Sequence, residues 1–198
     1  MFALTADQVD SRHGRDRADE ALAIIAGAAG DHLALPPDRT AGDEVQAITA
    51  DAGTALAVAL ALLRTGAWTV GLGIGSVREP LPDVTRAVGG DAFIAARTAV
   101  ERAKGRPTRF SAGGTEGAAE LVQPLVDLLL VTRERRTPEG WELFDLLESG
   151  MTQAAAAQRL GITPQAVSGR AQAAGIRVDA AARPALTTLL HMVDAGVA

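Results

Sequence analysis

The first half of the chain alternates short apolar runs with amphipathic stretches. Phe2–Ala6 is a short apolar run followed by polar residues, which predicts a buried strand that leads into a loop. Residues 17–29 place Leu and Ile among alanines at helical spacing, so we expect an amphipathic helix that ends at a glycine. Residues 33–48 contain two short apolar segments on either side of Gly42 and Asp43, which predicts a hairpin.

A second helix and another strand follow the hairpin. Asp51 opens a predicted helix over residues 55–64, and the glycine-rich residues 68–75 alternate as a strand. A further helix is predicted from about residue 92 to 104, and a loop or a weak last strand is predicted around 109–111. The order strand, helix, hairpin, helix, strand, helix is typical of the split βαββαβ arrangement. We therefore expect an α+β protein that begins with a ferredoxin-like βαββαβ palm domain.

The last third of the chain is predicted to be mostly helical. Residues 116–133 form a strongly apolar helix that either connects two domains or pairs with its copy in another subunit. Two helices follow at 141–148 and 153–160, a third begins at Thr163, and the chain then continues through a short strand at 176–178 and a closing helix at 184–193. We expect three parts: a palm domain at 1–115, a connecting helix and linker at 116–137, and an all-α helix-turn-helix domain at 138–198.

Residues 152–170, TQAAAAQRLGITPQAVSGR, have the features of two helices that cross at a tight turn. Small Ala156 allows a close approach, Gly161 permits the turn, and Thr163 followed by Pro164 begins the second helix with a cap. The string resembles the helix-turn-helix of sigma-factor-like and resolvase-like regulators, whose second helix enters the major groove of DNA. The resemblance implies DNA contacts by the exposed side of that helix, through Thr163, Gln165, Ala166, Ser168, Gly169, Arg170 and Gln172.

The alternative for these helices is a packing or dimerisation module that does not bind DNA. From Thr132 onward the chain has seven arginines and seven acidic residues, so this part is neutral, and Arg170 is the one strong cation of the predicted recognition helix. Because neutralisation of phosphates supplies much of the affinity for DNA, one copy would bind weakly. We therefore expect a homodimer or a partner protein.

Composition and charge narrow the class of protein. The 198 residues are 47% hydrophobic and 22% charged, which is ordinary for a chain that buries a core. A net charge of -5 argues against a surface that is basic throughout, so contact with DNA must be local. With no cysteine, disulfides, thiolate zinc sites and cysteine nucleophiles are excluded. The start lacks the pattern of a signal peptide, and the longest apolar run is far shorter than the roughly 20 residues of a membrane span, so we expect a cytoplasmic protein without a membrane partner.

Two carboxylates, Asp7 and Asp43, each follow an apolar run. Residues 6–11, ADQVDS, resemble the "A-D-I-V-G-S" segment of class III nucleotidyl cyclases, and residues 39–43 resemble their "K-x-x-G-D" hairpin. The resemblance implies that both aspartates hold Mg²⁺ ions on a nucleoside triphosphate, since Mg²⁺ takes hard oxygen ligands. Residues 90–97 resemble the cyclase helix that ends in "A-A-R", but Phe93 or Ile94 stands where that family has asparagine. This difference favours nucleotide binding over catalysis.

A second resemblance covers most of the chain. The N-terminal patterns "D-x-V-x-S-R…D-R" and "T-x-G-D-E-x-Q", followed by a helix-turn-helix, are similar to SatD-type bacterial proteins; they fall here on Asp7, Ser11, Arg12, Asp16, Arg17, Thr40, Gly42, Asp43, Glu44 and Gln46. Together, the two resemblances imply metal binding by Asp7 and Asp43. They imply ligand binding by Arg12, Arg39, Gly42, Glu44 and Arg97.

Three hypotheses follow from the sequence. The leading one is a homodimeric transcriptional regulator that binds a nucleotide with Mg²⁺ through its palm and DNA through its helix-turn-helix. The alternatives are an enzyme that acts on a nucleoside triphosphate, and a DNA-binding protein whose palm only holds a dimer together. Asp7 and Asp43 have a simpler alternative as caps of a loop and a turn, with Arg12, Arg17 or Arg39 as ion-pair partners. The glycines at 71, 73 and 75 lack the following helix of a dinucleotide site, and fit a closely packed strand instead.

Overall fold

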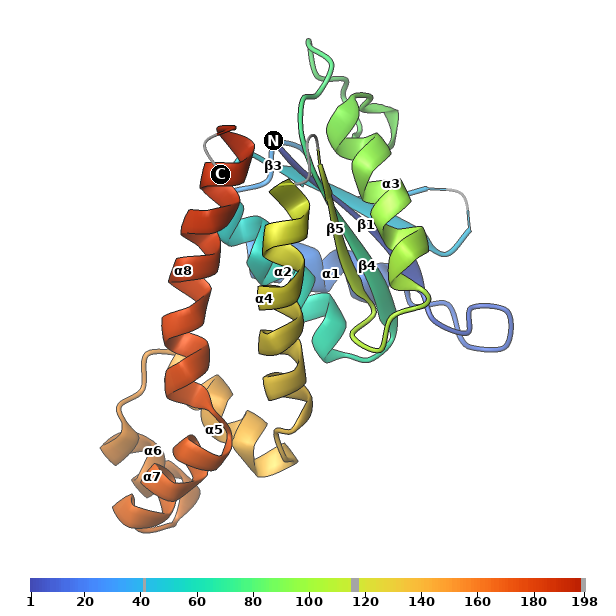
Figure 1. The fold of residues 1–198 in the computed structure, drawn as a ribbon. Coiled ribbons are helices and arrows are strands. Elements are labelled where there is room, and N and C mark those ends of the chain that lie inside the picture. Colours follow the sequence, from blue (N-terminus) through green and yellow to red (C-terminus); the bar gives the residue numbers. More distant parts are fainter. Residues whose placement is uncertain (41, 115–117, 197–198) are drawn as a thin grey trace. The chain divides into compact units, whose positions relative to one another are not determined.

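A computed structural model describes residues 1–40, 42–114 and 118–196 and divides the chain into two compact units. Residues 1–127, together with the chain from Ala185 onward, form the first unit; Leu128–Pro184 forms the second. In the described ranges the first unit contains β1 (Phe2–Gln8), α1 (Ala18–Ala29), β2 (Asp38–Arg39), β3 (Glu44–Thr49), α2 (Ala52–Arg64), β4 (Trp68–Ile74), the 3-10 turn η1 (Thr85–Ala87), α3 (Asp91–Ala103) and β5 (Phe110–Gly114) (Figure 1).

The five strands form one mixed sheet in the order β2-β3-β1-β4-β5. β1 lies antiparallel to both β3 and β4, and β5 lies parallel to β4. The protein is therefore of mixed α/β class, and the predicted order of strand, helix, hairpin, helix, strand and helix is confirmed. The hairpin is shorter on its first side than expected, because Leu33 makes only an isolated bridge to Thr49 and pairing resumes at Asp38.

Helices cover both faces of this sheet, with α1 and α2 on one side and α3 on the other (Figure 1). Alternation along β4 sends Trp68, Val70 and Leu72 to the first side, where all three are buried. On the second side, a Cβ atom at Gly71 or Gly73 would collide with the backbone of α3. The glycines are therefore required for close packing of helix on strand, as the sequence predicts.

Strand β5 is longer and more regularly paired than the weak strand predicted around 109–111. It pairs with β4 from Phe110 to Gly114, and its outer edge is covered by α4 (Ala118–Glu134). The Gln123 side chain accepts a hydrogen bond from the Ala112 amide at 2.9 Å and donates one to the Phe110 carbonyl at 3.3 Å. One side chain thus satisfies two backbone groups that an edge strand leaves unpaired.

The second unit is a small helical core. Its helices are α5 (Pro138–Glu148), α6 (Gln153–Leu160) and α7 (Pro164–Ala173). The end of α4 from Leu128 and the start of α8 (Ile176–Asp194) as far as Pro184 belong to the same unit. The Thr152 and Thr163 hydroxyls cap α6 and α7, and Gly161 ends α6 in a left-handed conformation with a φ of 65°. The buried core consists of Leu143, Phe144, Ala156, Ala157, Val167, Ala171, Ala174 and Ile176. The two capped helices and the turn between them are as predicted.

Helix α8 corrects one prediction. The structure has a single helix from Ile176 to Asp194 with Pro184 inside it, so the short strand predicted at 176–178 is wrong. A proline lacks the amide donor of a helix interior and was expected to mark a boundary. Tertiary contacts hold the turn before it: Ile176 is buried in the core, and Asp179 forms ion pairs with three arginines. No helix within the described ranges is both long and apolar enough to cross a membrane.

Candidate functional site

Asp7 lies near the end of β1 and forms an ion pair with a lysine. The Lys104 ammonium, just after α3, is 2.7 Å from the Asp7 carboxylate and 2.6 Å from Glu101. Both contacts raise the pKa of Lys104, with the hydrogen bond to Asp7 contributing most. The counter-ion of Asp7 is therefore a lysine, and not one of the arginines considered from the sequence.

The sheet register pairs Asp7 with Glu44 rather than with Asp43. Asp43 precedes β3 directly, and its backbone carbonyl accepts a hydrogen bond from the Gln8 amide at 3.2 Å. Because residues opposite each other on antiparallel strands share a face, Asp7 and Glu44 project from the same face of the sheet. The Glu44 carboxylate accepts hydrogen bonds from Thr40 and Gln46. In the described part of the chain, no three His, Cys, Asp or Glu side chains are grouped as a metal site.

Of the other residues predicted to bind a ligand, Arg39 and Gly42 lie together in the hairpin turn, whereas Arg12 and Arg97 belong to other elements. Arg39 forms an ion pair with Asp16 at 2.7 Å and donates a hydrogen bond to the Gly42 carbonyl, so it fastens the hairpin turn. A hydrogen bond from the Ala18 amide and the contact with Arg39 lower the pKa of Asp16. Arg12 is exposed in the loop after β1, and Arg97 is exposed on α3. None of these arginines lines the cavity next to Asp7.

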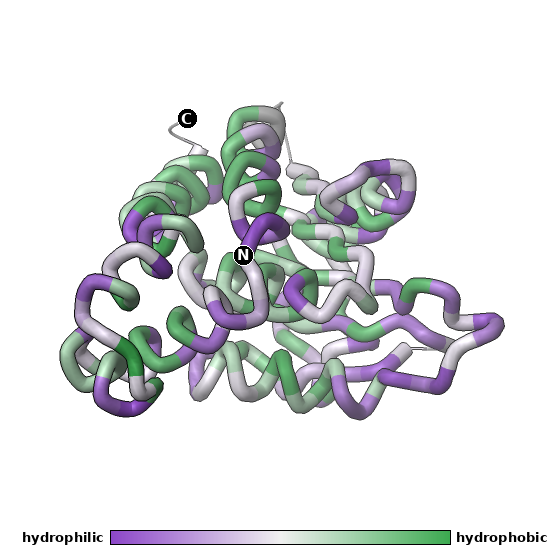
Figure 2. Tube along the Cα trace, turned by 90° about the horizontal axis from the view of Figure 1, so that it is seen from below, coloured by the Kyte–Doolittle hydropathy of each residue, from purple (hydrophilic) through white to green (hydrophobic). Residues whose placement is uncertain are grey.

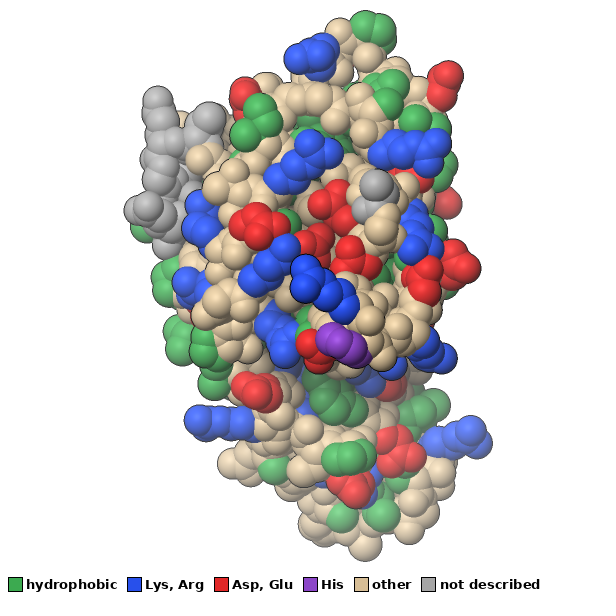
Figure 3. All heavy atoms as spheres, turned by 90° about the vertical axis from the view of Figure 1, so that its right-hand side faces the viewer, with side chains coloured by type: hydrophobic (Ala, Val, Ile, Leu, Met, Phe, Trp, Pro, Cys, Tyr) green, Lys and Arg blue, Asp and Glu red, His purple; other side chains and the backbone are tan. Residues whose placement is uncertain are grey.

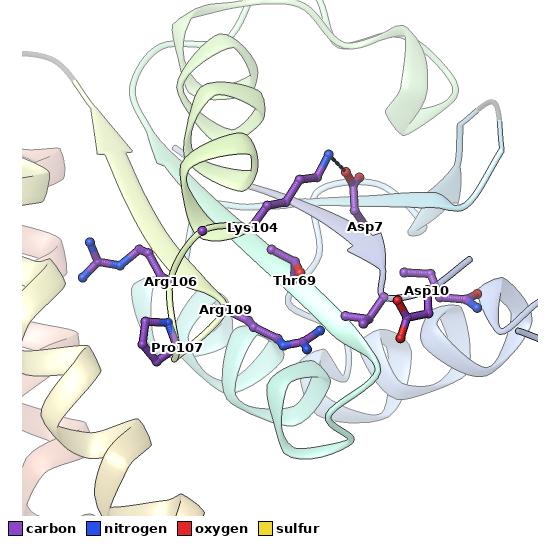
Figure 4. A pocket seen from close by; sticks show the side chains of 10 residues that line it. Asp7, Asp10, Thr69, Lys104, Arg106, Pro107 and Arg109 are labelled. Carbon is purple, nitrogen blue, oxygen red and sulfur yellow. Dashed lines mark ion pairs between the residues drawn. The ribbon is translucent and has the colours of Figure 1, made fainter. Parts of the chain in front are cut away.

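That cavity has a volume of about 540 Å³ and lies where β1 ends and β4 and β5 begin (Figure 4). Its lining residues are Asp7, Gln8, Val9, Asp10, Thr69, Lys104, Gly105, Arg106, Pro107 and Arg109. Acidic and basic side chains are interspersed over the middle of the surface in Figure 3, and hydrophilic residues dominate the loops at the right of Figure 2. The three cations that line this cavity were missed from the sequence, although all of them fall within residues 104–109.

The predicted DNA-contacting side of α7 is accessible. Val167 and Ala171 are buried in the core, whereas Thr163, Gln165, Ala166, Ser168, Gly169 and Gln172 are exposed. Arg170 is partly buried, and its guanidinium lies 3.5 Å from the Glu142 carboxylate on α5. The Thr163 hydroxyl accepts a hydrogen bond from the Ala166 amide, so it caps the helix as well as facing solvent.

The chain was also compared with known proteins. No model of a protein family, no curated protein and no solved structure matches it. The assignment of a function therefore depends on the residues and the geometry described above.

Proposed function

We propose that this chain is a DNA-binding transcriptional regulator whose first unit binds a nucleotide together with Mg²⁺. The observation that carries the proposal is the arrangement of α6 and α7, two capped helices joined at a left-handed glycine. Helix α7 presents an uncharged polar face, and such side chains donate and accept hydrogen bonds at base edges. The small residues on this face allow the helix backbone to approach the groove closely.

The electrostatics of α7 favour a homodimer. Arg170 is the only cation on this helix, and Glu142 competes for it. Since each neutralised phosphate adds affinity that depends on salt, a single copy gains little from its recognition helix alone. Two copies on two half-sites double these contacts, which is the usual solution for helix-turn-helix proteins.

For the first unit we propose a ferredoxin-like palm of the kind seen in nucleotidyl cyclases and in SatD-type proteins. The strand order β2-β3-β1-β4, with α1 and α2 on one face, supports this assignment. Asp7 and Asp43 would hold the metal, and Mg²⁺ would supply charge neutralisation for the phosphates. Carboxylate oxygens are suitable ligands for Mg²⁺. Lys104 binds one oxygen of Asp7, however, and would compete with the metal for that oxygen. The missing asparagine favours binding over turnover, and the proposed location is the cytoplasm.

DNA binding is tested by selecting sequences from a random duplex pool and measuring affinities for the enriched site. Arg170→Ala should weaken binding about tenfold and lower the salt dependence. Glu142→Gln removes the competing carboxylate, so it should strengthen binding. Arg78→Ala, an exposed arginine in the first unit, is the matched control. If no sequence is enriched, or if Arg170→Ala binds as well as the wild type, the regulator proposal fails.

Nucleotide binding is tested by calorimetry with a panel of nucleoside triphosphates, with and without Mg²⁺. The double variant Asp7→Ala/Asp43→Ala should lose the Mg²⁺-dependent part of the binding heat, because it removes both proposed metal ligands. Unchanged binding would contradict the metal assignment. The same mixtures are assayed for products: conversion of a triphosphate by the wild-type chain would identify an enzyme instead of a sensor.

A further inference from the structure

Only some of the charged side chains around the 540 Å³ cavity face into it. Arg106 turns away from Asp7 (Figure 4). Its guanidinium forms an ion pair with Asp127 on α4. Lys104 and Arg109 remain on the wall formed by the connection from α3 to β5. Asp7 and Asp10 form the opposite wall, and the Lys104–Asp7 ion pair joins the two walls at one point.

Arg109 is a solvent-exposed cation at the cavity wall. In the residues that the structure describes, its guanidinium has no carboxylate partner. Its backbone has a φ of 51°, a conformation that costs a non-glycine residue on the order of 1 kcal/mol. Hydrogen bonds from the Arg109 amide to the Arg106 carbonyl and from the Val70 amide to the Arg109 carbonyl hold this backbone. The fold thus keeps an unpaired arginine at the cavity wall at a cost.

Thr69 is a second donor without a partner. The residue is 5% exposed and lines the cavity, and its hydroxyl makes no hydrogen bond to another described residue. Because its oxygen is accessible to solvent, a ligand in the cavity can accept a hydrogen bond from this hydroxyl. The Thr69 hydroxyl and the Arg109 guanidinium line the same cavity, so a single anionic group there can accept hydrogen bonds from both (Figure 4).

We propose that this cavity binds the phosphate groups of a phosphorylated ligand, with Arg109 and Thr69 as contact residues and Lys104 as the adjoining cation. The planar guanidinium matches the oxygens of a phosphate, which accept two parallel hydrogen bonds from it. The negative charges of Asp7 and Asp10 repel a simple carboxylate ligand. Phosphate groups bind Mg²⁺, and this ion can also take carboxylate oxygens of the protein as ligands. The volume is within the range of small-molecule sites. The class of ligand, a phosphorylated compound, rests on the proposed nucleotide-binding function. Arg109 and Thr69 are contact residues that the sequence resemblances do not include.

The test is calorimetry on the full chain with inorganic pyrophosphate and with nucleoside triphosphates, each with and without Mg²⁺. Arg109→Gly should weaken binding of both probes by about 10- to 100-fold, because it removes charged hydrogen bonds. Glycine adopts the φ of this position without strain, so the variant should melt at the wild-type temperature or above. Thr69→Val should weaken binding about fivefold, and Arg109→Lys should fall between the wild type and Arg109→Gly. Arg78→Gly, outside the cavity, should bind like the wild type.

The outcomes separate this inference from the proposed function. If Arg109→Gly and Thr69→Val bind both probes as tightly as the wild type while Asp7→Ala/Asp43→Ala loses the Mg²⁺-dependent heat, the cavity inference is overturned and the nucleotide proposal stands. If Arg109→Gly loses pyrophosphate but the aspartate variant keeps it, the cavity inference is supported and the metal assignment fails. A wild-type chain that binds neither probe overturns both.

Discussion

At the scale of single residues, the second unit holds the buried charge of Asp179. This carboxylate is fully buried and accepts two hydrogen bonds from Arg133, at 2.7 and 2.9 Å, and one from Arg136 at 2.6 Å. Replacing it with asparagine would leave buried guanidinium groups without a counter-charge, and breaking such a pair costs about 3–5 kcal/mol. We expect Asp179→Asn to lower the free energy of unfolding by that order at neutral pH, measured by urea unfolding. Asp83→Asn, at an exposed aspartate, should have little effect.

The same residue predicts how stability depends on pH. Burial alone would raise the pKa of Asp179, but the hydrogen bonds and charges of Arg133 and Arg136 outweigh it and lower the pKa. A carboxyl whose pKa is lower in the folded state stabilises the fold above its unfolded pKa, near 4, and loses this effect as the pH falls through the folded value. The stability difference between wild type and Asp179→Asn should therefore shrink below about pH 4. A difference that stays constant down to pH 2 would show that the charge is not responsible.

At the scale of elements, the contact between β4 and α3 depends on the absence of side chains. A Cβ atom at Gly73 would overlap the carbonyl oxygen of Ala92, which belongs to the helix backbone and cannot rotate away. We expect Gly73→Ala to cost at least about 3 kcal/mol of unfolding free energy, or to prevent folding, because overpacking forces the helix off the sheet. Gly27→Ala is the matched control, since a Cβ there meets open space and alanine is the better helix former. Equal stability of the two variants by thermal unfolding would contradict this account.

The sequence predicts those elements that local patterns specify. The capped helices α6 and α7 follow from Thr152, Gly161 and Thr163, whose effects act within one turn. The continuity of α8 was missed, and β5 was predicted only as a loop or a weak strand around 109–111. Both depend on distant contacts, namely the arginines that bind Asp179 and the Gln123 side chain at the sheet edge. In the candidate site, Asp7 could be singled out from its motif. Its partner Lys104 follows a helix that lies beside it only in the folded chain.

At the scale of the whole molecule, helix α4 is the element most suited to bring two copies together. Leu121, Leu125, Leu128 and Val131 are between 39% and 66% exposed, and their spacing of four, three and three residues places them along one side of the helix. The opposite side, including Val122, Val126 and Leu129, is buried. A helix that is apolar on its exposed side as well as its buried side has further surface to cover. The proposed homodimer gives that surface a second copy of the same helix.

The variant Leu125→Glu/Leu128→Glu tests this dimer. Four like charges brought together across a pair of such helices would oppose association, so we expect sedimentation velocity to show a monomer where the wild type is a dimer. Loss of the dimer should weaken DNA binding only where two copies bind together. The affinity of the variant for a site with two half-sites should therefore fall, and its affinity for a single half-site should stay unchanged. Ile94→Glu, at an apolar residue that is 65% exposed on α3, controls for the added charge. If the wild-type chain binds DNA with two half-sites as a monomer, dimerisation through α4 is contradicted. The affinity for DNA would then come from the α7 face of a single copy.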